Sequence, residues 1–216
     1  MPQPGTLIPP EFYLRPVEQV ARDLLGRHLR HGDVVLRISE VEAYGGQADS
    51  ASHCRSGRTA RNAPMWEQGG RAYVYFCYGM HHMLNIVTGP AGDGCAILVR
   101  SCEPVSGLDL VRRRRGGQDG PVLLTGPGKV AQALGVDLTF SNHLLYRPGG
   151  LELLEGTPAA AILRGPRVGV DFAREPDRLR AWRFALAGSL WISRPKALEP
   201  DPGPNRSWKK PGSPGY

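Results

Sequence analysis

An alternating stretch that ends in acidic residues constrains this chain more than any other part of its sequence. Residues 34–53 read V-V-L-R-I-S-E-V-E-A-Y-G-G-Q-A-D-S-A-S-H, and the first eleven have the composition of a β-strand. Successive side chains of a strand point to opposite faces. Strict alternation therefore predicts a single face that begins apolar and ends in two carboxylates and a phenol, made of Val34, Leu36, Ile38, Glu40, Glu42 and Tyr44.

A carboxylate at the edge of an apolar face is a costly place for a charge unless the protein uses it. Desolvation at such a position makes a carboxylate a stronger proton acceptor, as a general base must be. The alternative is structural, because most short E-x-E strands carry solvated glutamates and perturbed acids also occur in structural ion pairs.

The charge of the chain favours a polyanionic partner. Its 216 residues suit one large domain, and the formal net charge is +7 with a pI of about 9.5. Lysine occupies only positions 129, 196, 209 and 210, so almost all cationic side chains are arginines. Arginine forks match phosphate oxygens in pairs. A GC-rich genome would enrich arginine equally well, and both explanations stay open.

The cysteines indicate a reducing compartment. Cys54, Cys77, Cys95 and Cys102 show no C-x-x-C spacing, so we expect neither a disulfide framework nor a zinc site. The His53-Cys54 and His81-His82 pairs fit no standard metal template, and no metal or cofactor is predicted. No signal peptide or membrane-spanning run is evident. We expect a soluble, cytoplasmic protein.

The chain divides into a flexible N-terminus at 1–10, one domain at 11–194 and a disordered basic tail at 195–216. Apolar spacing predicts a helix over 17–25 and another over 108–115. Strands are predicted at 71–78 and 83–87, at 94–102, and at the end of 182–194. A Gly-rich turn at 125–128 opens a helix that runs to 134.

Several of these segments carry residues suited to nucleic acid. Arg55, Arg58 and Arg61 lie in a small polar loop that could grip phosphates, and Lys129 sits at the start of the helix after the Gly-rich turn. By itself, the arginine loop is better explained as an ordinary solvated loop. Tyr78 opens the motif Y-G-M-H-H at a predicted hairpin tip, which looks like a wedge able to enter a base stack.

The chemistry that unites these features is cleavage of an N-glycosidic bond. An enzyme that acts on a base must move the base out of the duplex into a pocket with stacking walls. The reaction passes through an oxocarbenium-like state and needs a carboxylate to activate water, but no metal. Arg100 interrupts an apolar strand and needs a partner, for which Glu42 is the natural candidate.

At this point the sequence resembles the alkyladenine (3-methyladenine) DNA glycosylase family, of the type found in mammals. The shared motifs lie in the family's order between about residues 24 and 193: E-V-E-A-Y, S-H-x-R, T-A-R-N, Y-V-Y-F-C-Y-G-M, L-N, L-V-R-S-C-E-P, G-P-G-K, R-V-G-V and G-S-L-W-I-S. The resemblance implies a single mixed α/β domain, built on a curved antiparallel sheet with surrounding helices and a protruding hairpin.

The resemblance also implies catalytic roles. Glu42 would be the general base that activates the attacking water. Arg100 and the backbone carbonyl of Val168 would help to hold that water. The enzyme would be monofunctional, hydrolysing the base without cutting the strand, and would act as a monomer on double-stranded DNA that contains damaged purines.

The base would be held by a second set of residues. Tyr44 and His53 would stack on one face of the flipped base and Tyr75 on the other. The backbone N–H of His53 would bind the purine edge, and Asn85 would disfavour normal guanine by clashing with its 2-amino group. Tyr78 would fill the gap left in the duplex.

The sequence departs from the mammalian pattern at two places, which bear on the choice of lesion. Residues 81–83 are H-H-M where mammalian members carry aromatic residues and cysteine, and T-A-R-N replaces T-P-R-N. Expected substrates are 3-methyladenine and, depending on pocket fit, 7-methylguanine, hypoxanthine and ethenoadenine. Two other functions remain in competition: a non-catalytic binder of damaged nucleic acid, and a hydrolase of small nucleosides or glycosides.

Overall fold

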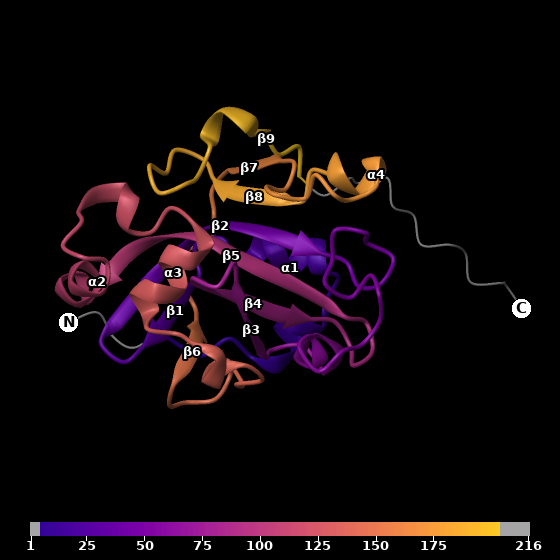
Figure 1. The fold of residues 1–216 in the computed structure, drawn as a ribbon. Helices are drawn as coiled ribbons and strands as arrows, with labels where there is room; N and C mark the ends of the chain where they lie inside the picture. Colours follow the sequence, from indigo (N-terminus) through magenta and orange to yellow (C-terminus); the bar gives the residue numbers. More distant parts are fainter. Residues whose placement is uncertain (1–4, 204–216) are drawn as a thin grey trace, which may run out of the picture.

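The computed structural model describes residues 5–203, and nine strands in this part form one antiparallel sheet (Figure 1). The sheet runs in the order β3-β4-β5-β2-β8-β7-β9; off this path, β1 pairs with β2, and β6 pairs with β1. The strands are β1 (His28–His31), β2 (Val34–Tyr44), β3 (Ala72–Cys77), β4 (His81–Thr88), β5 (Cys95–Ser106), β6 (Leu151–Leu154), β7 (Ile162–Gly165), β8 (Arg183–Leu186) and β9 (Glu199–Pro200).

Short helices surround the sheet. The α-helices are α1 (Val17–Leu24), α2 (Leu108–Arg114), α3 (Pro127–Leu134) and α4 (Glu175–Arg178), and five 3-10 turns lie at Pro10–Leu14, Ala63–Trp66, Gly120–Leu123, Leu138–Phe140 and Pro195–Ala197. Within residues 5–203, no helix has the length and apolar character needed to cross a bilayer. The predicted mixed α/β domain on an antiparallel sheet is confirmed, as are the three predicted helices.

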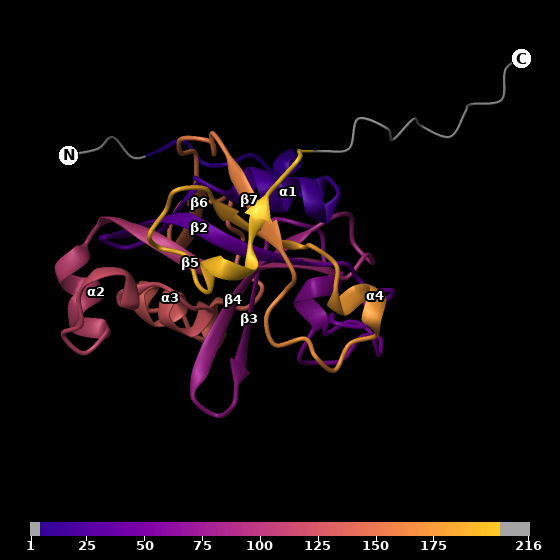
Figure 2. The ribbon, with the colours of Figure 1, turned by 90° about the horizontal axis from the view of Figure 1, so that it is seen from above.

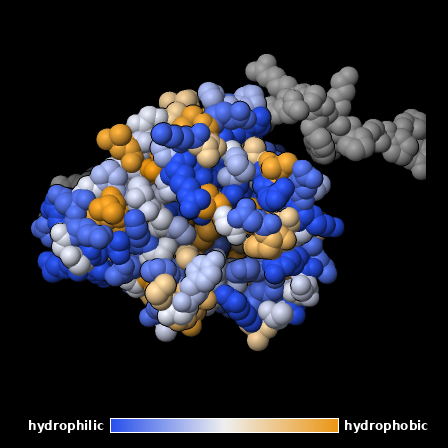
Figure 3. Space-filling model, turned by 45° about the horizontal axis from the view of Figure 1, so that its top comes forward, coloured by the Kyte–Doolittle hydropathy of each residue, from blue (hydrophilic) through white to orange (hydrophobic). Residues whose placement is uncertain are grey.

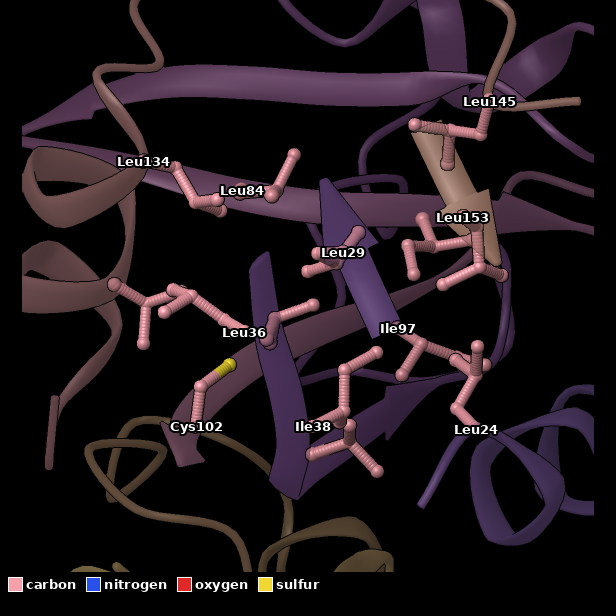
Figure 4. Close-up of a cluster of buried hydrophobic side chains, with 14 of the residues drawn as sticks. Leu24, Leu29, Leu36, Ile38, Leu84, Ile97, Cys102, Leu134, Leu145 and Leu153 are labelled. Carbon is pink, nitrogen blue, oxygen red and sulfur yellow. The ribbon is translucent and has the colours of Figure 1, made fainter. Parts of the chain in front are cut away.

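One hydrophobic core joins the helices to one face of the sheet (Figure 4). Leu24 of α1 and Leu134 of α3 are completely buried against sheet residues such as Leu36 and Ile97. Apolar area removed from water stabilises a fold by roughly 25 cal/mol per Å². The core therefore fixes where each face of β2 and β5 points.

The pleat of β2 changes phase in the middle of the strand, so the predicted single face is wrong. Val34, Leu36 and Ile38 belong to the core, but the next core residues are Val41 and Ala43. The register with β5 shifts on both sides of Glu40, which marks a β-bulge there. A one-residue slip moves every later side chain to the other face. Three side chains consequently lie opposite the core, those of Glu40, Glu42 and Tyr44.

The sheet also branches at this bulge. One edge of β2 pairs with β5, and before the bulge the other edge pairs with β1, from Val34 to Arg37. After it, the same edge pairs with β8, from Glu40 to Glu42. Residues of β2, β5 and β8 are thereby brought together on the face that the core does not occupy.

Strands β3 and β4 project from the body as a hairpin, between α3 on one side and the segment before α4 on the other (Figure 2). Their turn has positive φ at Tyr78 (52°) and Gly79 (67°), and the Met80 N–H donates to the Cys77 carbonyl over 3.1 Å. Positive φ at both central residues is what a type I′ turn requires. For tyrosine this conformation is strained, and such strain concentrates at functional sites.

Packed structure extends beyond both predicted domain boundaries. Ile8 is completely buried, and its N–H donates to the Leu153 carbonyl over 3.0 Å. At the other end, β9 pairs with β7, and Arg22 binds Asp201 over 2.7 Å. The packed part thus includes residues on either side of 11–194. Residues 1–4 and 204–216 of the predicted terminal segments lie outside the described residues.

The strand predicted at the end of residues 182–194 lies at the start of that segment instead, as β8. A turn follows directly at residues 187–189, and Leu190 is 79% exposed. The prediction is wrong at this end of the segment, because the hydrophobic residues that follow the turn do not pair in the sheet. The Gly-rich turn and the helix to residue 134 are found as predicted.

Candidate active site

The phase change in β2 places Glu42 on the face opposite the core, where three donors bind its carboxylate. The Val168 N–H donates to Oε1 over 2.7 Å, and the Tyr44 hydroxyl donates to Oε2 over 2.9 Å. Arg100 Nη1 lies 3.2 Å from Oε2, so the ion pair expected from the sequence is present. Glu42 is completely buried. A buried charge needs partners of this kind, because they replace the water that burial removes.

The neighbours of Glu42 are fixed in the protonation states that this arrangement needs. Burial, followed by the charge of Glu42, raises the pKa of Tyr44 well above its ordinary value, so its hydroxyl stays a donor. Burial opposes the charge of Arg100, but Glu42 and Glu40 outweigh this effect and raise the pKa of that guanidinium. Tyr44 and Arg100 therefore remain donors to the carboxylate at neutral pH.

Glu40, the second carboxylate of the E-V-E motif, is occupied by structural partners. It accepts hydrogen bonds from the Ser101 hydroxyl (2.7 Å) and the Ser193 N–H (2.7 Å), and it forms ion pairs with Arg100 (3.3 Å) and Arg183 (3.1 Å). It is completely buried and does not line the pocket described next. Arg100 thus bridges two carboxylates. Glu42 differs from Glu40 in being bound also by Tyr44 and Val168, which line that pocket.

A pocket of about 290 Å³ opens in front of this cluster. Its size is at the lower end for small-ligand sites, which suits a single base better than a larger group. Glu42 lies behind the wall formed by its three donors. The lining brings together most residues predicted from the sequence, namely Tyr44, His53, Arg61, Tyr75, Tyr78, Asn85, Arg100 and Val168.

His53 is an uncharged wall of this pocket. Burial first, and then the nearby charges of Arg61 and Arg55, lower its pKa to about 4. Its Nδ1 lies 3.0 Å from the Tyr73 hydroxyl, and its ring meets Tyr75 edge to face with centroids 4.5 Å apart. A base stacked between two rings needs about 3.5 Å on each side. The predicted placement of a base between His53 and Tyr75 therefore requires these rings to move apart, from 4.5 Å to about 7 Å.

Asn85 and Asn62 hold the walls in place. The Asn85 side chain donates to the Tyr73 carbonyl over 3.1 Å while it lines the pocket. Asn62, the last residue of T-A-R-N, donates to the His53 carbonyl over 3.0 Å and accepts from the Thr59 N–H over 2.7 Å. The sequence suggested a phosphate-gripping loop here. In the structure, Asn62 of this loop fixes the segment that carries His53.

Of the predicted phosphate contacts, Arg61 lines the pocket, and each of the three arginines has a partner within the chain. Arg58 pairs with Glu67 over 3.1 Å. Arg61 donates to the Phe76 carbonyl over 3.1 Å and lies over the Tyr75 ring. Arg55 lies over a phenylalanine ring. Burial, and then the charge of Arg115, lower the pKa of Lys129. The DNA-binding roles of these residues stay predictions.

A buried ion pair that the sequence did not reveal supports Tyr44 from behind. Arg167 and Asp49 are both completely buried at their side chains, and Arg167 Nη2 donates to Asp49 over 2.9 Å. The guanidinium carbon lies 4.8 Å from the centre of the Tyr44 ring. In the sequence, Arg167 was marked only as the first residue of R-V-G-V, one of the motifs shared with the family. No local pattern connects it with Asp49, which lies 118 residues away.

Fold and site together define a class of protein. A deeply buried carboxylate behind an aromatic pocket suits hydrolysis assisted by a general base. A strained, exposed tyrosine beside the same pocket suits an enzyme that first removes a base from a duplex. These features suit a DNA glycosylase.

Comparison with known proteins identifies the family. The methylpurine-DNA glycosylase (MPG) family matches residues 11–190, and the chain belongs to this family of N-glycosyl hydrolases. It is 54% identical over 194 residues to a protein of Nitrosococcus oceani that is named as a 3-methyladenine DNA glycosylase, covering 90% of this chain and 96% of the relative.

Two further relatives agree. The DNA-3-methyladenine glycosylase of Arabidopsis thaliana is 54% identical over 193 residues, covering 88% of this chain and 75% of the relative. A Frankia casuarinae protein named for the same activity is 42% identical over 198 residues, covering 86% and 92%. The predicted family is confirmed. Since these relatives are bacterial and plant proteins, they do not bear on the mammalian type.

Proposed function

We propose that this glycosylase excises alkylated purines, 3-methyladenine foremost, from double-stranded DNA, with Glu42 as the general base. The observation that carries the proposal is the carboxylate of Glu42, held by three donors behind an aromatic pocket. A carboxylate has about four lone-pair sites. Three donors therefore leave one site for a proton of the attacking water.

The reaction follows from this placement. The bond between C1′ of the sugar and the purine nitrogen breaks, and the leaving base takes the electron pair. Water forms the new bond to C1′, and its proton passes to Glu42. The negative charge of Glu42 also stabilises the oxocarbenium-like sugar, and the strand is not cut. Arg100 and Val168 act as orienting groups, as the family resemblance implies.

The walls of the pocket favour cationic, alkylated bases. Tyr44, His53 and Tyr75 present uncharged aromatic faces, since the histidine is neutral above about pH 4. A cation over an aromatic face gains roughly 0.5–2 kcal/mol. 3-methyladenine and 7-methylguanine carry such a charge in DNA. Hypoxanthine and ethenoadenine are neutral, and we propose them as weaker substrates.

The remaining parts of the proposal concern how the enzyme meets DNA. Tyr78 fills the space of the extruded nucleotide, and Arg55, Arg58, Arg61 and Lys129 contact the backbone. The enzyme works as a monomer in the cytoplasm, at the nucleoid in a bacterium. Binding to duplex DNA that weakens steeply with salt would support these contacts.

Glu42→Gln tests the proposal. Release of methylated base from alkylated duplex DNA should fall by roughly 10²-fold or more, because general-base catalysis contributes 10²–10⁴-fold. Binding to the damaged duplex should survive. Glu42→Asp, which keeps the charge but shortens the side chain, should retain more activity than the glutamine variant. Thermal unfolding of each variant checks that it is folded.

Two outcomes would contradict the proposal. Near-normal turnover by folded Glu42→Gln would remove Glu42 as the base. Wild-type protein that binds alkylated duplex DNA but releases no base would favour the non-catalytic binder.

A further inference from the structure

Exposed hydrophobic side chains single out a second residue at the mouth of the pocket. On the face in Figure 3, hydrophobic groups lie scattered within a mainly hydrophilic surface. Large hydrophobic residues are exposed at ten positions within residues 5–203. Of these ten, only two line the pocket, Tyr78 (85% exposed) and Phe172 (62% exposed). A function is already proposed for Tyr78, but none for Phe172.

Phe172 belongs to a different part of the chain from the hairpin. It lies on the segment between β7 and α4, which also contributes Val168, Gly169 and Val170 to the pocket lining. In Figure 2, the hairpin and the segment leading to α4 are neighbouring projections of the same side of the molecule. The pocket is therefore bordered by one exposed aromatic residue from each of two segments.

A charged partner holds the Phe172 ring. The guanidinium carbon of Arg55 lies 4.9 Å from the centre of that ring, at a distance typical of a cation–π contact. Arg55 is itself anchored, because its Nη1 donates to the Ser52 carbonyl over 3.1 Å. Its position two residues after His53 ties the ring to the segment that carries this pocket residue. An exposed ring held in this way loses little further entropy when it contacts a ligand.

We propose that Phe172, held by Arg55, packs against the extruded purine nucleotide at the mouth of the pocket and slows its return into the duplex. This inference rests on the proposed function. The ring supplies an apolar surface for the sugar or base, and Arg55 supplies a positive charge for the nucleotide's phosphate. Tyr78 then fills the gap left in the duplex, and Phe172 contacts the displaced nucleotide.

Binding measurements in a Glu42→Gln background test this role, because that protein should hold the lesion without cleaving it. The probe is a duplex with one 7-methylguanine, compared with the same undamaged duplex. Loss of an aromatic contact with a base costs about 1–3 kcal/mol, which is roughly 5- to 150-fold in affinity. Phe172→Ala should lower the preference for the damaged duplex by such a factor and leave binding to the undamaged duplex unchanged.

Matched variants separate a specific role of Phe172 from a general loss of exposed apolar surface. Leu179→Ala removes an equally exposed apolar side chain (61%) that does not line the pocket, and should change neither affinity. Phe172→Tyr should retain the preference. Arg55→Gln should lower it, and the double variant should lose less than the sum of the two single losses.

The outcomes separate this inference from the proposed function. If the Glu42→Gln parent shows no preference for the damaged duplex, the proposed function fails. If the parent shows the preference and Phe172→Ala retains it in full, the role of Phe172 is wrong. An equal loss toward both duplexes would also overturn it, because Phe172 would then contact ordinary duplex DNA. A Phe172→Leu variant repeats the test if the alanine variant does not fold.

Discussion

His53 should make the stability of this protein depend on pH between about 7 and 4. Its pKa falls from 6.5 in the unfolded chain to about 4 in the folded protein, with burial as the main cause. Between these two values, the unfolded chain binds a proton that the folded protein does not. Folding is therefore fully favoured above pH 6.5, and this contribution is lost as the pH falls toward 4.

The two pKa values give the size of the effect. Linkage between pH 7 and pH 5 predicts a loss of about 2 kcal/mol in the free energy of unfolding if the ring behaves as fully buried. Water at the mouth of the pocket screens part of this effect, so a loss of about 1 kcal/mol is the lower expectation. His53→Gln removes the titrating group and should remove this part of the pH dependence.

Urea unfolding of both proteins at pH 7 and pH 5 measures the effect. The variant loses ring contacts at both pH values. The effect of the proton is therefore the pH-dependent loss of stability in the wild type minus the same loss in the variant. Repeating the measurement in 0.5 M NaCl tests the cause. Salt screens Arg61 and Arg55 but not burial, so most of the effect should remain. Equal losses of stability in the two proteins from pH 7 to pH 5 would refute the reasoning.

Two other variants test features of the fold that surround the pocket. Asp49→Asn leaves the buried Arg167 without its counter-charge and should lower the free energy of unfolding by about 3–5 kcal/mol, measured by urea denaturation; an unchanged midpoint would contradict the role of this pair. Tyr78→Gly relieves the positive φ at the hairpin tip and should leave stability equal or slightly higher while weakening capture of the damaged duplex, and a clear loss of stability would contradict the description of a strained, exposed residue.

The sequence predicted the elements of this site better than their arrangement. β2 was predicted with its observed ends, because β-branched and alternating residues fill residues 34–44 and two glycines follow. The face predicted for its two carboxylates was wrong, because they lie opposite the core. The signal for the bulge was present, since apolar residues move from even positions (Leu36, Ile38) to odd positions (Val41, Ala43) within the strand. The prediction continued the even-numbered alternation beyond Ile38, although the apolar residues change to odd positions after it.

Long-range partners could not be predicted in this way. The contacts of Glu40 with Arg183 and Ser193, and of Asp49 with Arg167, join residues more than a hundred positions apart. No local period records such a pairing, because the sheet's branching decides which strands meet. Phe172 was missed for a related reason. Phe172 lies in a segment without regular secondary structure, so no helix or strand period assigns its side chain to a face, and only the folded structure shows that it lines the pocket.

The branching of the sheet explains how a buried charge cluster coexists with the hydrophobic core. Glu40 and Glu42 from β2 face Arg100 from β5 and Arg183 from β8, which gives two negative and two positive charges on the side away from the core. Without the bulge, both glutamates would point into the core packed beneath Ile38, where no donors lie. Because the phase changes, the apolar face remains continuous while the opposite face gathers donors from three strands. Fixed protein groups rather than bulk water then surround the carboxylate of Glu42.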